Sequence, residues 1–138
     1  MLSGLLLAAM MAGPVPCSVV RVLDGDTVQV TCAIWLGLHQ ETLVRIRGID
    51  TPEKAPRAKC PAEAVLAEKA SEFTKKALIP GQPVQLFQID NDKFGGRVDA
   101  ILHYDEPLAV GNSLGQRLIS AGLARPYDGR KKSDWCVP

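Results

Sequence analysis

Residues 17–32 read CSVVRVLDGDTVQVTC, two short β-rich runs on either side of an Asp-Gly dipeptide with a cysteine at each end. The runs at 18–23 and 26–31 are rich in valine and threonine, as strands are. Asp-Gly favours a two-residue hairpin turn, because glycine adopts the positive φ that such turns need. The stretch therefore predicts a β-hairpin with its turn at Asp24 and Gly25.

The four cysteines of the chain, at positions 17, 32, 60 and 136, are predicted to form two disulfides. Cys17 and Cys32 are equidistant from the predicted turn, so they should face each other as a hydrogen-bonded pair about 5.5 Å apart at Cα. A disulfide spans that separation, which leaves Cys60 and Cys136 to each other. None of the four is spaced as in a CxxC zinc motif. Two disulfides indicate an oxidising compartment, and the alternative is four buried thiols in a cytosolic protein.

The next part of the chain is predicted to add a third strand and a helix. Residues 33–41 form an apolar connection that contains a glycine, and alternation predicts a strand over 42–49. A helix is predicted over 61–79, with a proline in its first turn and a Pro-Gly stop. Apolar residues that recur at helical spacing predict its buried face: Leu66, Ala70, Phe73 and Ala77.

The remaining elements define the fold class. Strands are predicted over 83–89 and 97–104, and a short helix begins with the capping pair Ser113 and Gln116 and ends at Gly122. The order βββ-α-ββ-α predicts an α+β, mainly β fold. We expect a five-stranded OB-fold Greek-key barrel with one helix between strands three and four and a short C-terminal helix.

Length and composition fit a single domain. The chain has 138 residues, of which 46% are hydrophobic and 22% charged, close to the values of ordinary soluble proteins. The formal net charge of +1 does not by itself indicate a nucleic-acid-binding protein, so any basic surface must be local. Basic residues gather in two clusters, each either a binding surface or a solvated loop: Lys54, Arg57 and Lys59, and Arg125, Arg130, Lys131 and Lys132.

Residues 1–16, MLSGLLLAAMMAGPVP, carry no charged side chain and resemble the apolar part of a signal peptide followed by a cleavage region. The segment lacks a basic start and a clean A-x-A site. Prolines and a strand-like run follow too soon for a transmembrane span, and Pro16 stands where a lipoprotein signal has a small residue. We expect a signal-peptide-like segment over 1–16, a folded domain over 17–138, and a periplasmic or secreted protein without stable membrane association.

Carboxylates occur where the predicted second and third strands begin and end. Asp26 begins the second strand on its inward face and Asp50 ends the third, so the two side chains are expected to converge at the mouth of the barrel. Carboxylate and carbonyl oxygens suit a hard cation such as Ca²⁺. Glu53 lies just beyond, where it can orient or deprotonate a water.

Two arginines precede these acids. Arg45 and Arg47 supply planar, permanently charged donors that match phosphate oxygens. Strict alternation places them on the face opposite Asp50, and Gly48 is a natural site for a β-bulge that would restore a shared direction. Ion pairs with a purely structural role are the alternative interpretation of the same residues.

Four motifs follow one another along the chain: DGDTV at 24–28, RIRGIDTPE at 45–53, DKFGGRV at 92–98 and LISAGLARPY at 118–127. In their order and spacing, over residues 18–127, they resemble the thermonuclease, or staphylococcal-nuclease-like, family. The resemblance implies an OB-fold barrel with helices. It also implies Ca²⁺-dependent cleavage of DNA and RNA, which breaks the 5′-side P–O bond and leaves 3′-phosphate ends.

The resemblance assigns metal ligands and a residue that acts on water. The family's two aspartate ligands fall on Asp26 and Asp50, and its carbonyl ligand falls on Thr51. The glutamate that holds or activates the attacking water falls on Glu53.

The resemblance also assigns the residues that contact phosphate and base. The catalytic arginines fall on Arg45 and Arg97, and the expected substrate contacts are Lys93, Phe94 and Tyr127. Well-known members have tyrosine where this chain has Phe94, which can stack on a base but cannot donate a hydrogen bond to a phosphate. An additional glycine before Arg97 is expected to influence where that side chain lies.

We therefore expect a monomeric Ca²⁺-dependent nuclease that acts on DNA, RNA or both; carboxylate ligands also accept Mg²⁺ and Mn²⁺. The first alternative is a non-catalytic OB-fold module that binds nucleic acid. Converging carboxylates argue against it, because they repel phosphate. The second is a structural or periplasmic interaction protein, which would bind neither a metal nor nucleic acid in a salt-sensitive way.

Overall fold

The structure is a computed structural model that describes residues 10–105 and 112–137. The strands are β1 (Val15–Asp24), β2 (Thr27–Trp35), β3 (Leu38–Ile46), β4 (Ile49–Asp50), β5 (Pro83–Asn91), β6 (Arg97–His103) and β7 (Arg125–Pro126). The helices are α2 (Pro61–Ala77) and α3 (Leu114–Ser120). The predicted order of strands and helices is confirmed, and β4 and β7 are two short strands that the sequence analysis did not identify.

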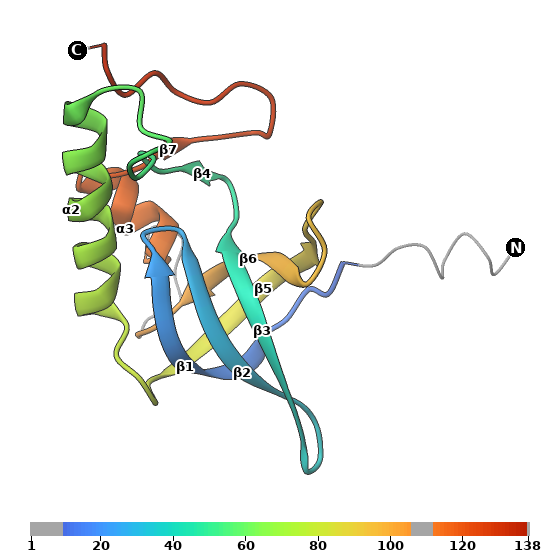
Figure 1. Cartoon of the computed structure of the whole chain (residues 1–138). Coiled ribbons are helices and arrows are strands. Elements are labelled where there is room, and N and C mark those ends of the chain that lie inside the picture. The colour runs from blue at the N-terminus through green and yellow to red at the C-terminus, as the bar shows by residue number, and fades with distance from the viewer. Residues whose placement is uncertain (1–9, 106–111, 138) are drawn as a thin grey trace, which may run out of the picture.

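Five strands close into a barrel in the order β1-β2-β3-β6-β5, with α2 packed beside β1 and α3 beside β6 (Figure 1). Neighbouring strands are antiparallel, except that β3 pairs with β6 in parallel. The two short strands β4 and β7 form a separate antiparallel pair. The predicted five-stranded OB-type barrel with two helices is therefore confirmed.

The barrel is filled by aliphatic side chains that alternate along its strands. Val28 and Val30 of β2, Val44 of β3, and Ala100 and Leu102 of β6 have no solvent exposure. Their spacing of two residues is the period at which a strand presents one face. Burial of each valine or leucine side chain contributes about 1.5–3 kcal/mol, so the core stabilises the barrel independently of the disulfides.

The first hairpin forms as predicted, but its turn lies one residue later. Gly25 and Asp26 occupy the turn, and Asp24 pairs with Thr27 as the last pair of the ladder. The sequence alternation could not distinguish the two placements, because Asp-Gly and Gly-Asp both suit a hairpin turn. The shift moves Asp26 out of the strand and into the turn.

Both predicted disulfides are present. Two register shifts in the β1–β2 ladder compensate for the displaced turn, so Cys17 and Cys32 still face each other. Their Cα atoms are 4.0 Å apart, which is shorter than predicted and closer to the value of about 4.5 Å for a non-hydrogen-bonded pair. The second disulfide joins Cys60, at the start of α2, to Cys136, with Cα atoms 6.1 Å apart.

The connection predicted over 33–41 is wrong, because most of these residues extend the second hairpin. β2 continues to Trp35 and β3 begins at Leu38, so only Leu36 and Gly37 form the turn. Gly37 has a φ of +72°, a conformation that favours glycine. This end of the hairpin projects beyond the barrel, and Trp35 and Leu36 are 74% and 92% exposed. These strand residues pack against no core, so they do not show the alternation of apolar and polar residues by which a strand is predicted.

Helix α2 ends at Ala77, two residues before the predicted end, and its buried face differs from the predicted stripe. Ala70 is buried as predicted, whereas Leu66, Phe73 and Ala77 are only partly buried. Polar residues share the buried face because hydrogen bonds to neighbouring loops satisfy two of them. The buried residues of the helix are Glu63, Ala67, Ala70, Ser71 and Thr74.

Helix α2 holds the turn of the first hairpin in place. Thr74 Oγ1 donates a hydrogen bond to the Gly25 carbonyl at 2.8 Å. The turn approaches the helix so closely that a Cβ atom added to Gly25 would lie 2.8 Å from the Cβ of Ala70. A residue without a side chain is therefore needed at position 25, next to Asp26.

Part of the predicted signal-like segment lies against the barrel, while residues 1–9 lie outside the described residues. Met11 exchanges two backbone hydrogen bonds with Ile89, at 2.8 and 2.7 Å. β1 begins at Val15, inside the predicted segment. No helix among the described residues is long and apolar enough to cross a membrane. The signal-peptide-like character of residues 1–16 stays a prediction.

Gly25→Ala is expected to lower the free energy of unfolding by about 1–3 kcal/mol, because the added methyl group overlaps Ala70. Urea unfolding of the wild type, Gly25→Ala, Ala70→Gly and the double variant measures this. Since Ala70→Gly removes the nearest atom, the double variant should lose less stability than the sum of the single changes. Strict additivity would contradict the close contact.

Candidate active site

Eight of the nine predicted metal, catalytic and substrate-binding residues line one open cleft beside the first hairpin turn. The cleft has a volume of about 420 Å³. The structure thus brings together residues from well-separated parts of the chain, whereas Asp50, the ninth, is not part of the lining. The eight are Asp26, Arg45, Thr51, Glu53, Lys93, Phe94, Arg97 and Tyr127.

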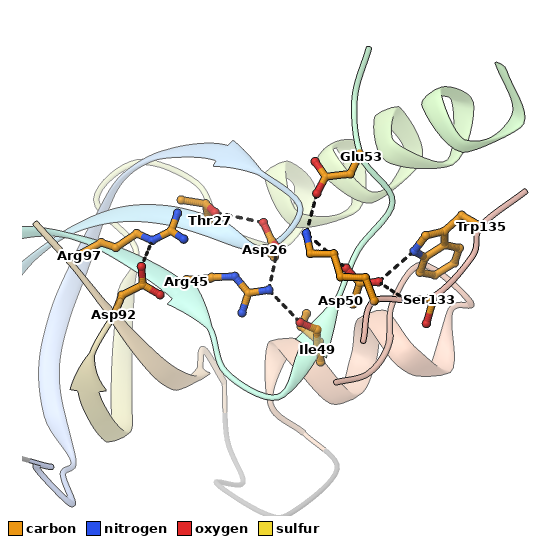
Figure 2. A network of polar contacts seen from close by, with 11 residues as sticks. Asp26, Thr27, Arg45, Ile49, Asp50, Glu53, Asp92, Arg97, Ser133 and Trp135 are labelled. Atoms are coloured by element: carbon orange, nitrogen blue, oxygen red, sulfur yellow. Dashed lines mark hydrogen bonds and ion pairs between the residues drawn. The ribbon is translucent and has the colours of Figure 1, made fainter. Parts of the chain in front are cut away.

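Asp26 and Arg45 face each other in the cleft (Figure 2). Thr27 is the pairing partner of Arg45, and the Ile46 amide donates to the Asp26 carbonyl at 2.8 Å, so strand register sets the two side chains side by side. Asp26 Oδ2 lies 3.9 Å from Arg45 Nη2, and Thr27 Oγ1 donates to Asp26 Oδ1 at 3.0 Å. Only 16% of the Arg45 side chain and 18% of the Asp26 side chain are exposed. Both charges are therefore shielded yet open to the cleft.

Gly48 turns the chain and does not form the predicted bulge. It has a φ of +82° and lies in the turn between β3 and β4. Arg45 Nη2 donates to the Ile49 carbonyl across this turn at 3.2 Å. The side chain of Arg47 does not line the cleft, and its Nη1 lies 4.0 Å from Asp90 Oδ2. The two arginines consequently have different environments, and Arg47 is ion-paired outside the site.

Tyr127 covers Arg45 from the C-terminal side of the chain. Its amide donates to the Gly48 carbonyl at 2.9 Å, directly after β7. The guanidinium carbon of Arg45 lies 5.8 Å from the centre of the Tyr127 ring, within the range of a cation–π contact. The turn at Gly48 thus positions both residues.

Asp50 lies beneath the C-terminal residues and is only 2% exposed. Its strand β4 pairs with β7, with Asp50 opposite Arg125, and the following residues fold back over it. Asp50 Oδ2 accepts hydrogen bonds from the Ser133 amide at 3.1 Å and from Trp135 Nε1 at 3.3 Å (Figure 2). Asp50 is thus engaged by the C-terminal residues and does not line the cleft, and its convergence with Asp26 stays a prediction.

Glu53 is paired with Lys132, a residue that the sequence analysis placed only in a basic cluster. Lys132 Nζ donates to Glu53 Oε1 at 2.7 Å and lies 3.9 Å from Asp50 Oδ1. The hydrogen bond to Glu53, with the charges of both carboxylates, raises the pKa of Lys132 and outweighs the opposite effect of burial. Lys132 also lines the cleft, so the cleft contains a permanent ammonium group beside the predicted catalytic acid.

The loop that carries Glu53 is held by Glu63, which the sequence analysis missed. Glu63 is the third residue of α2 and is 4% exposed. Its Oε2 accepts from the Glu53 amide and its Oε1 from the Lys59 amide, both at 2.9 Å. A glutamate at the third helical position often bonds amides that precede the helix. Its place two residues after Pro61 was the signal that could have identified it.

Arg97 reaches the cleft despite the additional glycine before it. Asp92 Oδ2 accepts from Arg97 Nε at 2.6 Å and from the Phe94 amide at 3.1 Å. Burial acts to raise the pKa of Asp92, but these hydrogen bonds outweigh it and hold that pKa below its ordinary value. Phe94 is 71% exposed, with the guanidinium carbon of Arg97 at 5.0 Å and Lys93 Nζ at 5.2 Å from its ring centre. This exposed ring between two cations can stack on a base.

Asp99 is a second acidic residue that the sequence analysis missed. It lies opposite Arg45 in the β3–β6 ladder. Its Oδ1 is buried and has no hydrogen-bond partner among the described residues. Burial, followed by the proximity of Asp92, raises the pKa of Asp99 to about 6. Asp99 therefore binds a proton at a higher pH than an ordinary carboxyl group.

The predicted ligand atoms fit a hard divalent cation chemically. Carboxylate oxygens from Asp26 and Asp50 and the carbonyl of Thr51 are the donors that Ca²⁺ accepts. In the part of the chain that the structure describes, however, no three Asp, Glu, His or Cys side chains gather closely enough to hold a metal ion. Lys132 lies against the one oxygen of Asp50 that accepts no bond from Ser133 or Trp135.

Comparison with known proteins adds a family match and a relative. A family model described as staphylococcal nuclease homologue matches residues 43–135. The match runs from β3 to the C-terminal residues that cover Asp50. An uncharacterized lipoprotein of Mycoplasma genitalium is 33% identical over 110 residues, which is 77% of this chain and 42% of that protein. The chain thus spans less than half the length of this curated relative.

Asp99→Asn is expected to stabilise the protein above pH 6 more than at pH 4. Because the folded-state pKa is about 6 and the ordinary value is 3.8, the folded state binds the extra proton between these values. The free energy of unfolding of the wild type therefore falls as pH rises through this window. Urea unfolding from pH 4 to 8 measures the difference. Asp128→Asn, whose side chain is 68% exposed, is the control, and a difference independent of pH would contradict the assignment.

Glu63→Gln is expected to lower the free energy of unfolding by about 1–3 kcal/mol, because an NH₂ group replaces one of the two carboxylate oxygens that accept from the Glu53 and Lys59 amides. Chemical unfolding at neutral pH measures the loss. Glu68→Gln, an exposed position on the same helix, is the matched control. Equal stability of the two variants would show that Glu63 does not hold the Glu53 loop.

Proposed function

The chain belongs to the staphylococcal nuclease homologue family, and on that premise we propose that it is a metal-dependent nuclease that hydrolyses phosphodiester bonds of DNA, RNA or both. One observation carries the proposal: residues of three of the separated motifs, together with Tyr127 of the fourth, line one cleft. The cleft combines fixed guanidinium groups with carboxylates. Cationic side chains alone would suit binding of an anion. Guanidinium groups that stabilise developing charge, together with carboxylates that can accept a proton, suit a reaction at phosphorus.

Ca²⁺ is the proposed ion, with Asp26, Asp50 and the carbonyl of Thr51 as its ligands. Once bound, such an ion polarises a phosphoryl oxygen and offsets negative charge on the reacting group. The same oxygen ligands accept Mg²⁺ and Mn²⁺, so activity with each ion has to be compared.

Glu53 is the proposed general base. It would orient a water molecule and take its proton as the water oxygen attacks phosphorus. The 5′-side P–O bond would break, the leaving oxygen would take a proton from solvent water, and the products would carry a 3′-phosphate and a free 5′-hydroxyl. The Glu53 side chain is 32% exposed, so water reaches it from the cleft. Its pair with Lys132 has to open first, because a carboxylate oxygen bound to an ammonium is a weaker base.

Arg45 and Arg97 are proposed to stabilise the charge that develops on the phosphoryl oxygens. Each is already held: Arg45 by Asp26 and the Ile49 carbonyl, Arg97 by Asp92. Donors fixed before the reaction lower the barrier, since they need no reorganisation when charge develops. Their planar groups can also bond two oxygens at once.

Three further residues are proposed to position the nucleic acid. Phe94 offers an exposed ring on which a base can stack. Lys93 supplies a cation beside that ring for the phosphate backbone. Tyr127 lines the cleft next to Arg45, where its ring or hydroxyl can contact a nucleotide.

A non-catalytic module that binds nucleic acid is the second candidate, and the Lys132–Glu53 pair favours it. In this arrangement Glu53 is occupied by an ammonium group and Asp50 is covered. A site that stayed so would bind phosphate through its cations without hydrolysing it.

We also propose that the protein works outside the cytoplasm. Its four cysteines form two disulfides, which persist in oxidising compartments. The similar Mycoplasma protein is described as a lipoprotein, and this agrees with a location at or beyond the membrane.

The function is tested by incubating the purified protein with single-stranded DNA, duplex DNA and RNA, in Ca²⁺ and in a chelator. We expect Ca²⁺-dependent cleavage, with ends that phosphatase treatment identifies as 3′-phosphates. Glu53→Gln should lower the rate about 10²–10⁴-fold, because it removes the base. Arg45→Gln should lower it about 10²–10³-fold, because it removes a donor to the transition state.

Arg130→Gln is the matched control for Arg45→Gln, since the Arg130 side chain is 89% exposed and does not line the cleft. It should cut at the wild-type rate. Absence of cleavage with Ca²⁺, Mg²⁺ and Mn²⁺, together with salt-sensitive DNA binding, would instead establish the binding module.

A further inference from the structure

We propose that Lys132 is a built-in competitor of the divalent cation: its ammonium group lies between Asp50, a proposed metal ligand, and Glu53, the proposed base, and the metal binds by displacing it. The inference rests on the proposed function, because it concerns the same carboxylates. It makes Lys132 a residue that sets the metal affinity of the site.

The first support is the position of the ammonium group. Lys132 Nζ lies 2.7 Å from Glu53 Oε1 and 3.9 Å from Asp50 Oδ1. A monovalent cation thus stands where two of the proposed functional carboxylates meet. Two like charges cannot share that position, so a divalent cation and the ammonium group exclude each other.

The second support is the way in which Asp50 is engaged. Its Oδ2 already accepts bonds from the Ser133 amide and Trp135 Nε1, and the Asp50 side chain is only 3% exposed. Oδ1 faces Lys132. A metal ion that approaches Asp50 from the cleft therefore meets Lys132 before it meets the carboxylate.

The third support is the tether that keeps Lys132 in place. The segment 128–137, here called the tail, is joined to the start of α2 by the Cys60–Cys136 disulfide. Arg125 also fixes it, through the Asp134 carbonyl at 3.1 Å and the Trp135 ring at 4.2 Å. A group tethered this closely competes as if it were at high concentration.

The position of Lys132 is also specific within its basic cluster. Arg130 is 89% exposed and its one ion pair, among the described residues, is with Asp128 in the same loop. Lys131 is exposed and forms no ion pair in the described part of the chain. Only Lys132 of these three points to the carboxylates of the site. The lysine remains displaceable, because half of its side chain (52%) is exposed and such pairs are weak.

The test is calorimetric titration of Ca²⁺, without nucleic acid, into the wild type, Lys132→Met and Lys131→Met. Lys132→Met should bind Ca²⁺ about two- to fivefold more tightly, the range expected when a partly exposed competing cation is removed. Lys131→Met removes the same charge from the neighbouring position and should match the wild type. This control separates displacement of Lys132 from a general change in net charge.

A second readout follows the tail itself. In a Trp35→Phe background the remaining tryptophan is Trp135, whose indole bonds to Asp50. Addition of Ca²⁺ should change its fluorescence, because the ion binds the carboxylate to which the indole donates, with a midpoint equal to the calorimetric Kd. Ca²⁺ binding without any change in Trp135 emission would show that the ion does not bind Asp50 and would overturn the inference.

Failure of the inference differs from failure of the proposed function. Equal Ca²⁺ affinity of the wild type and Lys132→Met, with Ca²⁺-dependent cleavage intact, would overturn the role of Lys132 alone. If neither protein bound Ca²⁺ and the wild type did not cut, both the Ca²⁺-dependent function and this inference would be wrong.

Discussion

The pairing of β3 along both of its edges is the constraint on which the cleft depends. On one edge β3 pairs with β2, which sets Asp26 beside Arg45; on the other it pairs in parallel with β6, which brings Arg97 to the same place. Val44 and Ile46 are fully or almost fully buried on either side of Arg45. A slip of one residue would turn the arginine into the core. The register that fills the barrel therefore also orients the arginine, so stability and chemistry share one set of backbone hydrogen bonds.

Helix α2 adds a second constraint, because polar residues near its two ends hold two parts of the cleft. Near its start, Glu63 bonds the amide of Glu53, and near its end, Thr74 bonds the carbonyl of Gly25 next to Asp26. Both polar residues are buried, so their hydrogen bonds are costly to lose. The helix thus fixes the spacing between two carboxylates that are distant in sequence. The C-terminal tail then covers the third, Asp50, and replaces solvent with a lysine.

Much of the fold could be predicted because it follows from local patterns. The first hairpin, the helix after the third strand and the partners of all four cysteines came from alternation, turn residues and equal spacing. The errors have physical causes. The hairpin tip near Trp35 packs against no core, so its apolar residues carry no periodic signal. Gly48 lies in a turn between β3 and β4, and the residue that bonds its carbonyl, Tyr127, is remote in sequence. Glu63 was overlooked because its carboxylate oxygens accept hydrogen bonds from backbone amides of the preceding loop.

The sequence by itself determined the barrel, both disulfides and the chemical groups of the site. Strand alternation, helical spacing and turn residues act over a few positions, where backbone geometry and hydrophobic burial decide the outcome. Only the tertiary structure decided which of these groups meet. Lys132 and Glu53 are 79 positions apart, and Asp50 turns toward Ser133 and Trp135. Such contacts depend on how the tail packs against β4 and α2, since electrostatic attraction acts across space and leaves no pattern along the chain.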